Sequence, residues 1–546
     1  MAPNHVPVLV VGGSLVGMSA ALMLGHHGIR ALVVEHHRGT AIHPRAAQIS
    51  QRTMEIFRSV GLEAVIRRRS AEQFVQDGAI MAVETLAGRE LAWFIANLNE
   101  GVRDVSPTER VFVSQSLLEP LLKSRAADLG ADLRFGTEMI AFDQDADGVT
   151  AVLKARDTGA TETVRATFMI AADGTHSGVR KRLGIGVSGR GTFSHSVTIY
   201  FRGDVAPLLA GRNLSVIYVS NSSLRGFFRI EKPFDRGFLA VNATGDPASP
   251  VTDVATGITS ERCLELVRLA LGTDDVAVTI ENVMPWEAAA HVADRFADGR
   301  VFIAGDAAHV MPPNGGFGGN TGVQDAQNLA WKMAMVLEGK AGSELLDTYE
   351  SERRPVAAFT VEQAYSRYVT RTAPYLSADG IQPLADDLNV ELGYGYRSAA
   401  VIPEAGDDGA TLHQNPRGSA ARPGTRAPHV WLERQGQRIS TLDLFGRRFA
   451  LLTLADGMRW RQGADRVTRE LGVPLDVYEV GSGQLIDPAG GFAAAYGLKA
   501  GDCVVVRPDG FVGWRASGDK SDASFDLTRA LSAMLRRREA GQRVNT

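Results

Sequence analysis

A glycine-rich turn near the N-terminus could hold the phosphates of a dinucleotide. Residues 8–24 read VLVVGGSLVGMSAALML, in which an apolar run enters a glycine pair and a helix of small residues follows. Gly12 stands where such a turn bends the chain, and Gly17 stands where the helix must pack closely on the strand. Ser14 occupies the middle position, where a glycine would let the backbone approach the pyrophosphate, but its hydroxyl can donate to a phosphate. The stretch predicts a dinucleotide site; the alternative is an ordinary tight turn between a strand and a helix.

An acidic residue follows this turn at the distance expected for a ribose contact. Glu35 lies 23 residues after Gly12, at the end of a second apolar strand. Its carboxylate can accept hydrogen bonds from ribose hydroxyls, and it would repel a 2′-phosphate. The sequence therefore predicts a dinucleotide with an unphosphorylated ribose, and not NADP, at this turn.

A second glycine-rich stretch, RVFIAGDAAHVMPPNGGFGGNTGVQDAQNLAWKM at residues 300–333, has the groups that a flavin needs. An apolar strand leads to Gly305 and Asp306, whose carboxylate can accept from a ribose or a polyol. Residues 314–322 can bring several backbone N–H groups to a flat ligand, and the following helix directs its positive end to the same place. Reduction of a flavin places negative charge near N1 and O2, which such a helix end stabilises. The alternative is a structural loop with a structural aspartate.

A third motif, MIAADGTHSGVRKRLGI at residues 169–185, again ends an apolar strand in Asp-Gly. Ser177 and Arg180 follow Asp173 at the start of a predicted helix. Alone, this pattern fits an ordinary β-turn with a helix cap as well as it fits a ligand contact.

In this order and spacing, the three motifs resemble the FAD-dependent aromatic hydroxylases of the para-hydroxybenzoate hydroxylase fold, which are single-component class A flavoprotein monooxygenases. The family's Asp-Gly fingerprint matches Asp173, Ser177 and Arg180, and its Gly-Asp fingerprint matches Gly305 and Asp306. The likeness covers residues 6–370. Within the family, the sequence is most similar to bacterial hydroxylases that modify aromatic polyketides of the anthracycline, angucycline and tetracycline types. Shorter stretches that also resemble the family are HPRA at 43–46, RTME at 52–55, SQSLLEPLL at 114–122 and LLDTYESERRPVA at 345–357.

The resemblance implies a cofactor contact for each motif. Glu35 is expected to bind the adenosine ribose, Arg45 and Gln115 to contact the FAD, and Asp306 to contact its ribityl chain. Residues 318–322 are expected to line the isoalloxazine. The cofactor-binding residues predicted are Gly12, Ser14, Leu15, Val16, Gly17, Glu35, Arg45, Gln115, Asp173, Gly305, Asp306, Pro313, Gly318, Gly319, Asn320 and Thr321.

The resemblance also implies a monooxygenase that consumes NADPH or NADH and O₂. NAD(P)H would reduce the flavin, O₂ would add at C4a, and the hydroperoxide would transfer its distal oxygen to an electron-rich phenolic ring. Few acid–base side chains are then expected, and Arg45 and Pro313 are the candidates for a catalytic role. Asp173 and Arg180 are expected near the FAD and the path of NAD(P)H. The sequence shows no second dinucleotide fingerprint, as expected if NAD(P)H docks transiently over the flavin. No metal site is predicted, and His309 is interpreted as a side chain packed beside a loop.

Other functions remain open from the residues alone. These are a Baeyer–Villiger or ring-rearranging oxygenase on the same fold, a flavin oxidase or reductase, and a flavin-binding module without catalysis. An NAD-dependent dehydrogenase accords least with the motifs.

A polycyclic aromatic substrate is expected between the flavin and a β-rich segment that interrupts the nucleotide-binding pattern. The candidates for contact with it are Tyr218, Phe227, Arg229 and Trp286. The alternative is that these aromatic side chains belong to the core of the sheet.

The composition excludes several other classes of protein. The 546-residue chain has 62 acidic and 58 basic residues and a net charge of −4, so nothing favours nucleic acid or an anionic membrane. Cys263 and Cys503, its two cysteines, give neither a disulfide framework nor a metal-ligand spacing, which suits a reducing compartment. Residues 6–25 lack the positive start of a signal peptide, since Arg30 is the first basic residue, and no stretch is long enough to span a membrane. We expect a cytoplasmic monomer or homodimer.

The elements that must position these motifs form an α/β fold. Residues 6–35 read as a strand, a helix and a strand, the βαβ unit of a Rossmann-like domain. Further elements are expected as helices at 51–65 and 116–129, strands within 132–172 and an antiparallel sheet over 186–284.

The predicted domains are a discontinuous FAD-binding domain (1–185 and 285–400), an inserted β-rich substrate domain (186–284), a linker (401–428) and a C-terminal domain (429–546). The last has the order β-α-β-α-β-β, with a hairpin turn at 508–510. In the polyketide hydroxylases that the chain resembles, this domain is thioredoxin-like. Here it has no Cys-x-x-Cys, which excludes dithiol redox chemistry, and we expect a packing or dimer-supporting role.

Overall fold

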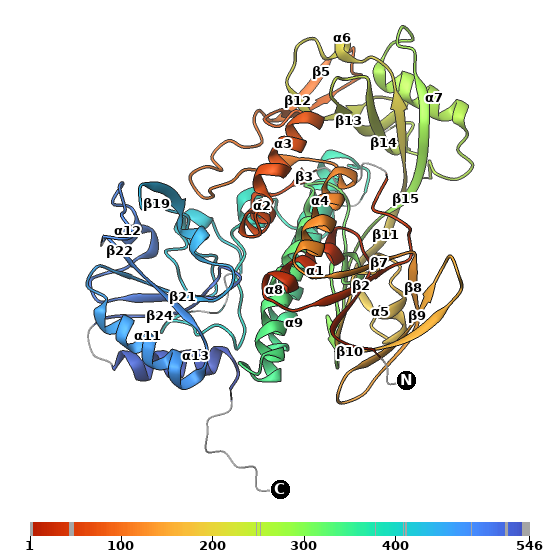
Figure 1. Ribbon diagram of the computed structural model, residues 1–546. Coiled ribbons are helices and arrows are strands. Elements are labelled where there is room, and N and C mark those ends of the chain that lie inside the picture. Colours follow the sequence, from red (N-terminus) through yellow and green to blue (C-terminus); the bar gives the residue numbers. More distant parts are fainter. Residues whose placement is uncertain are drawn as a thin grey trace.

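The chain forms a parallel sheet, a second and mostly antiparallel sheet, and a smaller C-terminal sheet, with two long helices between them. Figure 1 shows the computed structural model, which describes residues 4–42, 48–246, 248–251, 253–376, 378–407, 409, 412–481, 483–518 and 522–537. The long helices α8 (Phe317–Leu337) and α9 (Thr348–Arg371) lie between the parallel sheet and the C-terminal part of the chain. Within the described ranges, no helix is both long and apolar enough to cross a membrane.

The first sheet, which we call the parallel sheet after its central strands, has the strand order β16-β17-β10-β1-β2-β7. The strands β17, β10, β1, β2 and β7 pair in parallel, whereas β16, β9 and β8 are added to it by antiparallel pairs, β9 on β10 and β8 on β9. β1 pairs in parallel with both β2 and β10. Val8, Leu9 and Val10 have no exposed surface, as expected for a strand that is covered on both faces. The predicted strand–helix–strand unit is confirmed as β1, α1 (Leu15–His26) and β2. The strands are β1 (Asn4–Val11), β2 (Ala31–Glu35), β7 (Asp132–Phe135), β8 (Thr137–Gln144), β9 (Val149–Ala155), β10 (Thr161–Ala171), β16 (Ala297–Asp298) and β17 (Val301–Ile303).

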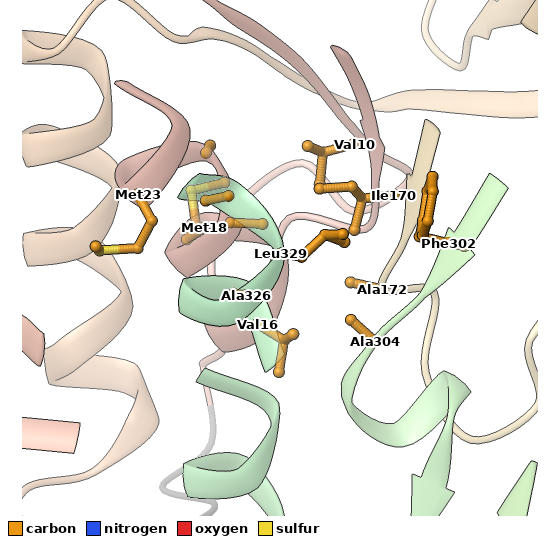
Figure 2. Close-up of a cluster of buried hydrophobic side chains, with 14 of the residues drawn as sticks. Val10, Val16, Met18, Met23, Ile170, Ala172, Phe302, Ala304, Ala326 and Leu329 are labelled. Atoms are coloured by element: carbon orange, nitrogen blue, oxygen red, sulfur yellow. The ribbon is translucent and has the colours of Figure 1, made fainter. Parts of the chain in front are cut away.

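The main core lies where α1 and α8 pack on the parallel strands. Figure 2 shows Val10, Ile170 and Phe302 of three neighbouring strands beside Val16 of α1 and Leu329 of α8. All five side chains are buried, so this core fixes the N-termini of α1 and α8 relative to the ends of the strands.

The other predicted N-terminal helices are confirmed with one correction. The helix expected at 116–129 is α4 (Gln115–Asp128). The helical stretch expected at 51–65 is confirmed, but it consists of two helices, α2 (Gln51–Ser59) and α3 (Glu63–Gln73), of which the second extends beyond residue 65. Gly61, with φ of +79°, lies between them and ends α2, since a residue with a side chain rarely adopts this conformation.

The second sheet has the strand order β18-β15-β11-β14-β13-β12-β4-β5. Antiparallel pairing was expected, and every pair is antiparallel except β12 with β4. β4 and β5 come from residues before 186, and β15 continues past residue 284, so the sheet is wider than the segment 186–284. Helix α7 (Ser260–Leu271), which the β-rich reading of this segment missed, packs its buried Cys263 and Leu266 against one face. The strands are β4 (Ala79–Val83), β5 (Glu90–Ile95), β11 (Val187–Arg202), β12 (Leu214–Ser220), β13 (Leu224–Glu231), β14 (Arg236–Thr244), β15 (Thr279–Ala293) and β18 (His309–Val310).

The C-terminal part folds around a sheet with strand order β22-β21-β23-β24. Its element order confirms the predicted β-α-β-α-β-β pattern, and helix α13 and the hairpin β19–β20 are additions to it. The hairpin turn predicted at 508–510 joins β23 to β24. The elements are β19 (Trp431–Arg434), β20 (Gln437–Ser440), β21 (Phe449–Leu454), α11 (Met458–Leu471), β22 (Leu475–Val480), α12 (Phe492–Tyr496), β23 (Cys503–Val506), β24 (Val512–Ala516) and α13 (Ala523–Met534).

Short elements connect these parts. β3 pairs with β6 in a separate two-stranded sheet, and η1 follows soon after β17. The described residues of 401–428 contain η3 and are otherwise irregular, as expected for a connecting segment. The short elements are β3 (Gln48–Ile49), β6 (Val111–Phe112), α5 (Gly178–Arg182), α6 (Ala206–Leu209), α10 (Asp387–Glu391), η1 (Gly305–Ala307), η2 (Ser343–Leu345), η3 (Pro416–Gly418) and η4 (Thr441–Leu444).

Both cysteines are fully buried and neither forms a disulfide. Cys263 lies in α7 and Cys503 begins β23. Burial raises the pKa of both thiols. The two side chains therefore act as small apolar residues of their cores.

The half-buried His26 and the buried His429 make the fold sensitive to acid. Burial, together with Arg447, lowers the pKa of His26 to about 4, and burial with Arg426 lowers the pKa of His429 to about 4. In the unfolded chain both rings bind a proton near pH 6.5. The free energy of unfolding is thus expected to be highest above pH 6.5 and to fall as the pH drops from 6.5 to 4, by at most about 1.4 kcal/mol per pH unit for each ring. Denaturant unfolding across this range measures the slope, and His429→Gln should make it shallower; an unchanged slope in that variant would contradict the role of His429.

Candidate active site

A cavity of about 1070 Å³ opens at the carboxyl ends of β1, β2 and β10. These strands are neighbours in the parallel sheet, so the residues that follow them meet at one edge. The structure thereby brings together the first and third motifs and the start of α4. Among the predicted cofactor-binding residues, those that line the cavity are Gly12, Ser14, Glu35, Gln115 and Asp173.

The glycines of the first motif are required by backbone contacts. A Cβ on Gly12, which has φ of +102°, would lie 2.2 Å from the carbonyl oxygen of Ala172. A Cβ on Gly17 would lie 1.8 Å from the carbonyl oxygen of Gly12. The turn, the helix and the end of β10 therefore approach more closely than any side chain permits, and the exposed Ser14 stands at the cavity side of this turn.

Glu35 holds the turn beside the cavity. Its Oε2 accepts a hydrogen bond from the N–H of Gly13 at 2.7 Å, and its Oε1 accepts from the N–H of His37 at 2.8 Å. The side chain is 7% exposed and lines the cavity, so the carboxylate keeps an open side for a hydroxyl group. Glu35, His36 and His37 also have ligand atoms within 4.8 Å of one another, and the absence of a metal site stays a prediction.

The third motif contributes an acceptor without a partner. Asp173 Oδ2 accepts from the N–H of Val179 at 3.1 Å, whereas Oδ1 is buried and has no hydrogen-bond partner. Arg180 extends away to the second motif, where it donates to the carbonyl oxygen of Ala307 at 2.7 Å. Arg182, and not Arg180, lines the cavity. A buried carboxylate oxygen without a hydrogen-bond partner fits a ligand group that would donate to it.

The second motif packs directly against the first. A Cβ on Gly305 would lie 2.8 Å from Val16 Cγ2, and a Cβ on Gly319 would lie 2.8 Å from Leu15 Cδ2. The N-terminus of α8 thus adjoins the N-terminus of α1, and both helices direct their positive ends toward one region. Asp306 is exposed beside this junction.

The other predicted cofactor-binding residues near the start of α8 differ in their hydrogen bonds and in their exposure. Asn320 is engaged with its own chain, because its Oδ1 accepts from the N–H of Ser50 at 2.9 Å and its Nδ2 donates to the carbonyl oxygen of Gln48 at 2.9 Å. Thr321 Oγ1 donates to the carbonyl oxygen of Phe317 within the helix. Gly318 is half-buried in the first turn, and Pro313 is exposed in the loop. Arg45 lies outside the described residues.

Sequence reasoning missed Asp325, which fixes the Gly305 turn. Its Oδ2 accepts from the N–H of Gly305 at 3.1 Å and bonds His309 Nε2 at 2.7 Å, while Oδ1 accepts from Arg353 Nε at 2.8 Å. Asp325, His309 and Arg353 have fully buried side chains. Burial opposes ionisation of Asp325, but His309 and Arg353 outweigh it and hold the pKa of this carboxyl below its usual range. The signal in the sequence was a lone acid in an otherwise uncharged stretch of the helix after the glycine-rich loop.

Glu119 was also missed. It is 1% exposed and lines the cavity from α4. Its Oε1 accepts from Gln115 Nε2 at 2.6 Å, and its Oε2 accepts from the N–H of Ala41 at 2.7 Å. An acid four residues after the predicted Gln115, on the same helix face, could have indicated this pair.

Three of the four candidate substrate residues lie together on the second sheet. Tyr218 of β12 pairs with Phe227 of β13, and Arg229 follows two residues later on the same face. We call Tyr218, Phe227 and Arg229 the aromatic face. Trp286 lies apart, because β11 and β14 separate its strand β15 from β13, and its Nε1 donates to Thr198 Oγ1 at 3.0 Å.

Arg229 is a buried cation without an ion-pair partner in the described part of the chain. Its guanidinium carbon lies 4.8 Å from the ring centre of Phe74 and 4.2 Å from that of Phe112. The side chain is 4% exposed, and its Nε and Nη2 have no hydrogen-bond partner. Burial lowers the pKa of Arg229 to about 9, and Glu231 only partly opposes this shift. An anionic or strongly polar ligand group would compensate this charge.

The site as a whole fits FAD. Its glycine turn brings the strand ends and the start of α1 closer together than a Cβ permits. Asp173 Oδ1 has no hydrogen-bond partner, and the N-terminus of α8 adjoins that of α1, whose turn lines the cavity with Glu35. These are the groups that a pyrophosphate, a ribose and a reduced flavin require. The fold and the site define an FAD-binding protein with a second sheet beside its cofactor cradle.

Comparison with known proteins agrees with this assignment. A family described as "FAD binding domain" matches residues 5–364, and one described as "Aromatic-ring hydroxylase, C-terminal" matches residues 420–537. A 4-methyl-5-nitrocatechol 5-monooxygenase of Burkholderia sp is 52% identical over 97% of this chain and 98% of its own length. The tetracenomycin A2 monooxygenase-dioxygenase of Streptomyces glaucescens is 40% identical over 98% of each chain. The crystal structure of a ternary complex of aklavinone-11 hydroxylase with FAD and aklavinone has a TM-score of 0.92 and 38% identity, covering 98% of this chain and 100% of that one.

The chain therefore belongs to the FAD-dependent aromatic-ring hydroxylases and is a monooxygenase of that family. The resemblance that the three motifs indicated is confirmed.

Proposed function

We propose that this chain hydroxylates an aromatic phenol, with FAD as bound cofactor and with NADPH or NADH and O₂ as co-substrates. The observation that carries the proposal is a contact between the two sides of the site. Asn314, in the glycine-rich loop before α8, donates to the hydroxyl oxygen of Tyr218 at 3.4 Å. This hydrogen bond joins the loop on the flavin side to the aromatic face, and oxygen transfer requires the flavin and the substrate ring to lie within reach of each other.

The motif residues divide the binding of FAD among them in this proposal. Bound FAD would supply the redox chemistry by accepting a hydride from NAD(P)H and activating O₂. The N–H groups at the N-terminus of α1 bind the pyrophosphate, Glu35 accepts from the adenosine ribose, and Asp306 accepts from the ribityl chain. The positive end of α8, at Gly318 and Gly319, stabilises negative charge on the reduced ring system.

Arg229 determines the chemical class of the substrate. A buried guanidinium without a carboxylate partner favours a phenolate or another anionic oxygen on the ligand. Deprotonation also makes the ring more electron-rich, so Arg229 holds the substrate in its reactive form. The buried rings of Phe74 and Phe112 hold the Arg229 guanidinium from behind, and the half-buried Phe227 supplies aromatic surface for a flat ring.

The proposed substrate is a polycyclic phenol of the polyketide type. The names of the aklavinone hydroxylase and of the tetracenomycin monooxygenase-dioxygenase support this class. A monocyclic nitrocatechol is the second candidate, because the 52% identical relative is named for one and a nitrocatechol is an acidic phenol that suits Arg229 equally well. Oxygen insertion into a ring bond, as in a Baeyer–Villiger reaction, is the alternative outcome on the same site.

Turnover under ¹⁸O₂ tests this function. The purified protein is expected to be yellow, to consume NADPH or NADH faster when a polycyclic phenol is present, and to place one ¹⁸O atom in a new hydroxyl group. Label only in a nitrocatechol product would favour the second candidate, and label in a lactone would indicate ring insertion. Substrate-stimulated NAD(P)H oxidation without ¹⁸O in any product would refute the monooxygenase reaction.

We also propose the domain roles and the setting of the protein. Residues 1–185 and 285–400 bind FAD, and residues 186–284 supply the central strands of the substrate sheet, which β4, β5 and the rest of β15 complete. Residues 401–428 connect these to a thioredoxin-like C-terminal domain (429–546), which the sheet β22-β21-β23-β24 with α11 and α13 supports. The balanced charge and the two thiols support a cytoplasmic monomer or homodimer.

Glu35→Gln is expected to weaken FAD binding about 10-fold. The glutamine amide lacks the negative charge of Glu35, which accepts from the N–H groups of Gly13 and His37 and is proposed to accept from the ribose. A hydrogen bond to a charged group contributes about 1.5–3 kcal/mol. Fluorescence titration of the apoprotein with FAD measures the dissociation constant. Glu138→Gln, on the exposed rim of the same cavity, is the control and should bind FAD like the unaltered protein.

A further inference from the structure

The C-terminal part of the chain inserts one turn into the FAD-binding part. This hairpin turn (residues 507–511) joins β23 to β24 and reaches α2, α8 and α9. Trp331 of α8 and Phe449 of β21 meet edge to face at 5.8 Å, so the two parts also share an apolar core.

Arg507 ties the hairpin turn to α9. Its Nη1 and Nη2 donate to the two carboxylate oxygens of Glu352 at 2.6 and 2.8 Å, which is a two-pronged pair. Lys332 of α8 donates to the same carboxylate at 2.8 Å. All three side chains are fully buried. Burial opposes ionisation of Glu352, but Arg507 and Lys332 outweigh it and hold its pKa below the ordinary value.

Asp509 ties the same turn to α8 and α2. Its Oδ2 accepts from Trp331 Nε1 at 3.1 Å and from Asn328 Nδ2 at 3.4 Å, both on α8. Its carbonyl oxygen accepts from Arg52 Nη2 of α2 at 2.7 Å. One residue of the C-terminal part therefore fixes the relative position of two helices that flank the glycine-rich loop.

The contacts continue from α9 to the second motif. Arg353, the neighbour of Glu352, donates to Asp325 and to the carbonyl oxygen of Thr321 in the first turns of α8, the latter at 3.2 Å. Asp325 in turn accepts from the N–H of Gly305. Two sets of buried polar contacts, joined through the adjacent α9 residues Glu352 and Arg353, thus lead from the hairpin turn to the loop and helix end where the flavin is proposed to lie. Such a network has strict geometry, because each buried charge depends on its partner.

We propose that the hairpin turn of the C-terminal domain positions α8 for FAD, with Asp509 and Arg507 as positioning residues. The inference rests on the proposed placement of the flavin at the N-terminus of α8. It gives the C-terminal domain a part in cofactor binding that needs no redox chemistry of its own. Loss of the Asp509 side-chain contacts with Asn328 and Trp331 frees α8 from the hairpin turn and lets the helix end move relative to the Gly12 turn.

Asp509→Asn tests the proposal with little change in shape. We expect FAD to bind the variant at least threefold more weakly and backbone amides of residues 317–325 to exchange hydrogen faster in the apoprotein. Arg507→Lys, which keeps the charge but loses the two-pronged pair, should give a smaller change in the same direction. Leu527→Ala is the matched control, because it removes a fully buried side chain from the core of the same domain without touching the network.

The outcomes separate a positioning role from simple stabilisation. A structural role predicts that Asp509→Asn and Leu527→Ala lower the unfolding temperature alike and leave FAD affinity and exchange in α8 unchanged, which would overturn the inference. If Asp509→Asn does not fold, Arg507→Lys decides by the same two measurements. Unaltered protein that does not bind FAD would refute the proposed function instead, so the two failures are distinguishable.

Discussion

Gly17→Ala is expected to lower the affinity for FAD by at least ~100-fold, a change of about 2.7 kcal/mol. The new Cβ would lie 1.8 Å from the carbonyl oxygen of Gly12 and 3.4 Å from Val10 Cγ1. Neither neighbour can move freely, because Gly12 is itself pressed against Ala172 and Val10 lies fully buried in the central strand. The helix must therefore shift away from the turn, and the N–H groups of the cradle lose their common direction.

FAD titration of the refolded or reconstituted apoprotein measures this change. Gly418→Ala is the control, because a Cβ there meets no atom within 4 Å and the backbone conformation is ordinary. A Gly17→Ala protein that retains its yellow colour through gel filtration and titrates like the control would show that the glycine turn is not the FAD cradle.

Arg229→Met is expected to have opposite effects on catalysis and on stability. Removal of the cation that pairs with a phenolate should lower kcat/KM about 100-fold, since loss of a buried charged contact costs 2–5 kcal/mol. The same change removes an unpaired buried charge, and this relieves a desolvation penalty of several kcal/mol. It also removes the cation–π contacts with Phe74 and Phe112, which stabilise the fold by up to about 2 kcal/mol each. The free energy of unfolding should therefore rise by about 1 kcal/mol.

Steady-state kinetics, FAD titration and denaturant unfolding together measure these effects. FAD affinity should not change. Arg236→Met is the matched control, because this arginine lies in the same sheet on β14 but is exposed and paired with Glu281. A variant with unchanged kcat/KM and lower stability would assign Arg229 to the core of the sheet, as the alternative interpretation of this segment holds.

The sequence predicted the elements whose pattern is local. Residues 8–35 show an apolar run, a small-residue helix and a second apolar run, and each periodicity depends only on neighbours along the chain. The C-terminal order of strands and helices was predicted for the same reason. Helix α7 was missed because the alternating runs on either side of it suggested strands throughout, although its own apolar residues Cys263, Leu266, Val267 and Ala270 follow helical spacing.

Pairings between distant segments could not be predicted. β4 and β5 join the second sheet through β12, more than a hundred residues later, and no local pattern specifies that partner. The turn at 508–510 was recognised as a turn, but nothing in its residues indicates that Arg507 pairs with Glu352. Long-range ion pairs of this kind depend on the packing of whole domains.

Among the predicted site residues, those whose position follows from a local pattern were predicted better than those whose partners lie far away in the sequence. Gly12, Glu35 and Asp173 follow strands that are adjacent in the sheet, so a rule about strand ends was enough to group them. Asn320 was expected at the cofactor, yet its side chain bonds β3 and α2, since a carboxamide has enough donors and acceptors to serve the backbone instead. Asp325 supports the Gly305 turn and Glu119 supports Ala41 at the cavity wall, and these long-range partners depend on the fold.

The burial of both cysteines matters for an enzyme that handles oxygen. Without a substrate to accept the oxygen, bound FAD reduced by NAD(P)H would pass two electrons to O₂ and give hydrogen peroxide, and peroxide attacks the thiolate form of cysteine. Cys263 and Cys503 have no exposed surface, and burial raises the pKa of each, so little thiolate exists and peroxide cannot reach it. Both cysteines are therefore protected from hydrogen peroxide made at the active site. After repeated NAD(P)H oxidation without substrate, a thiol assay of the denatured protein should still find two free thiols.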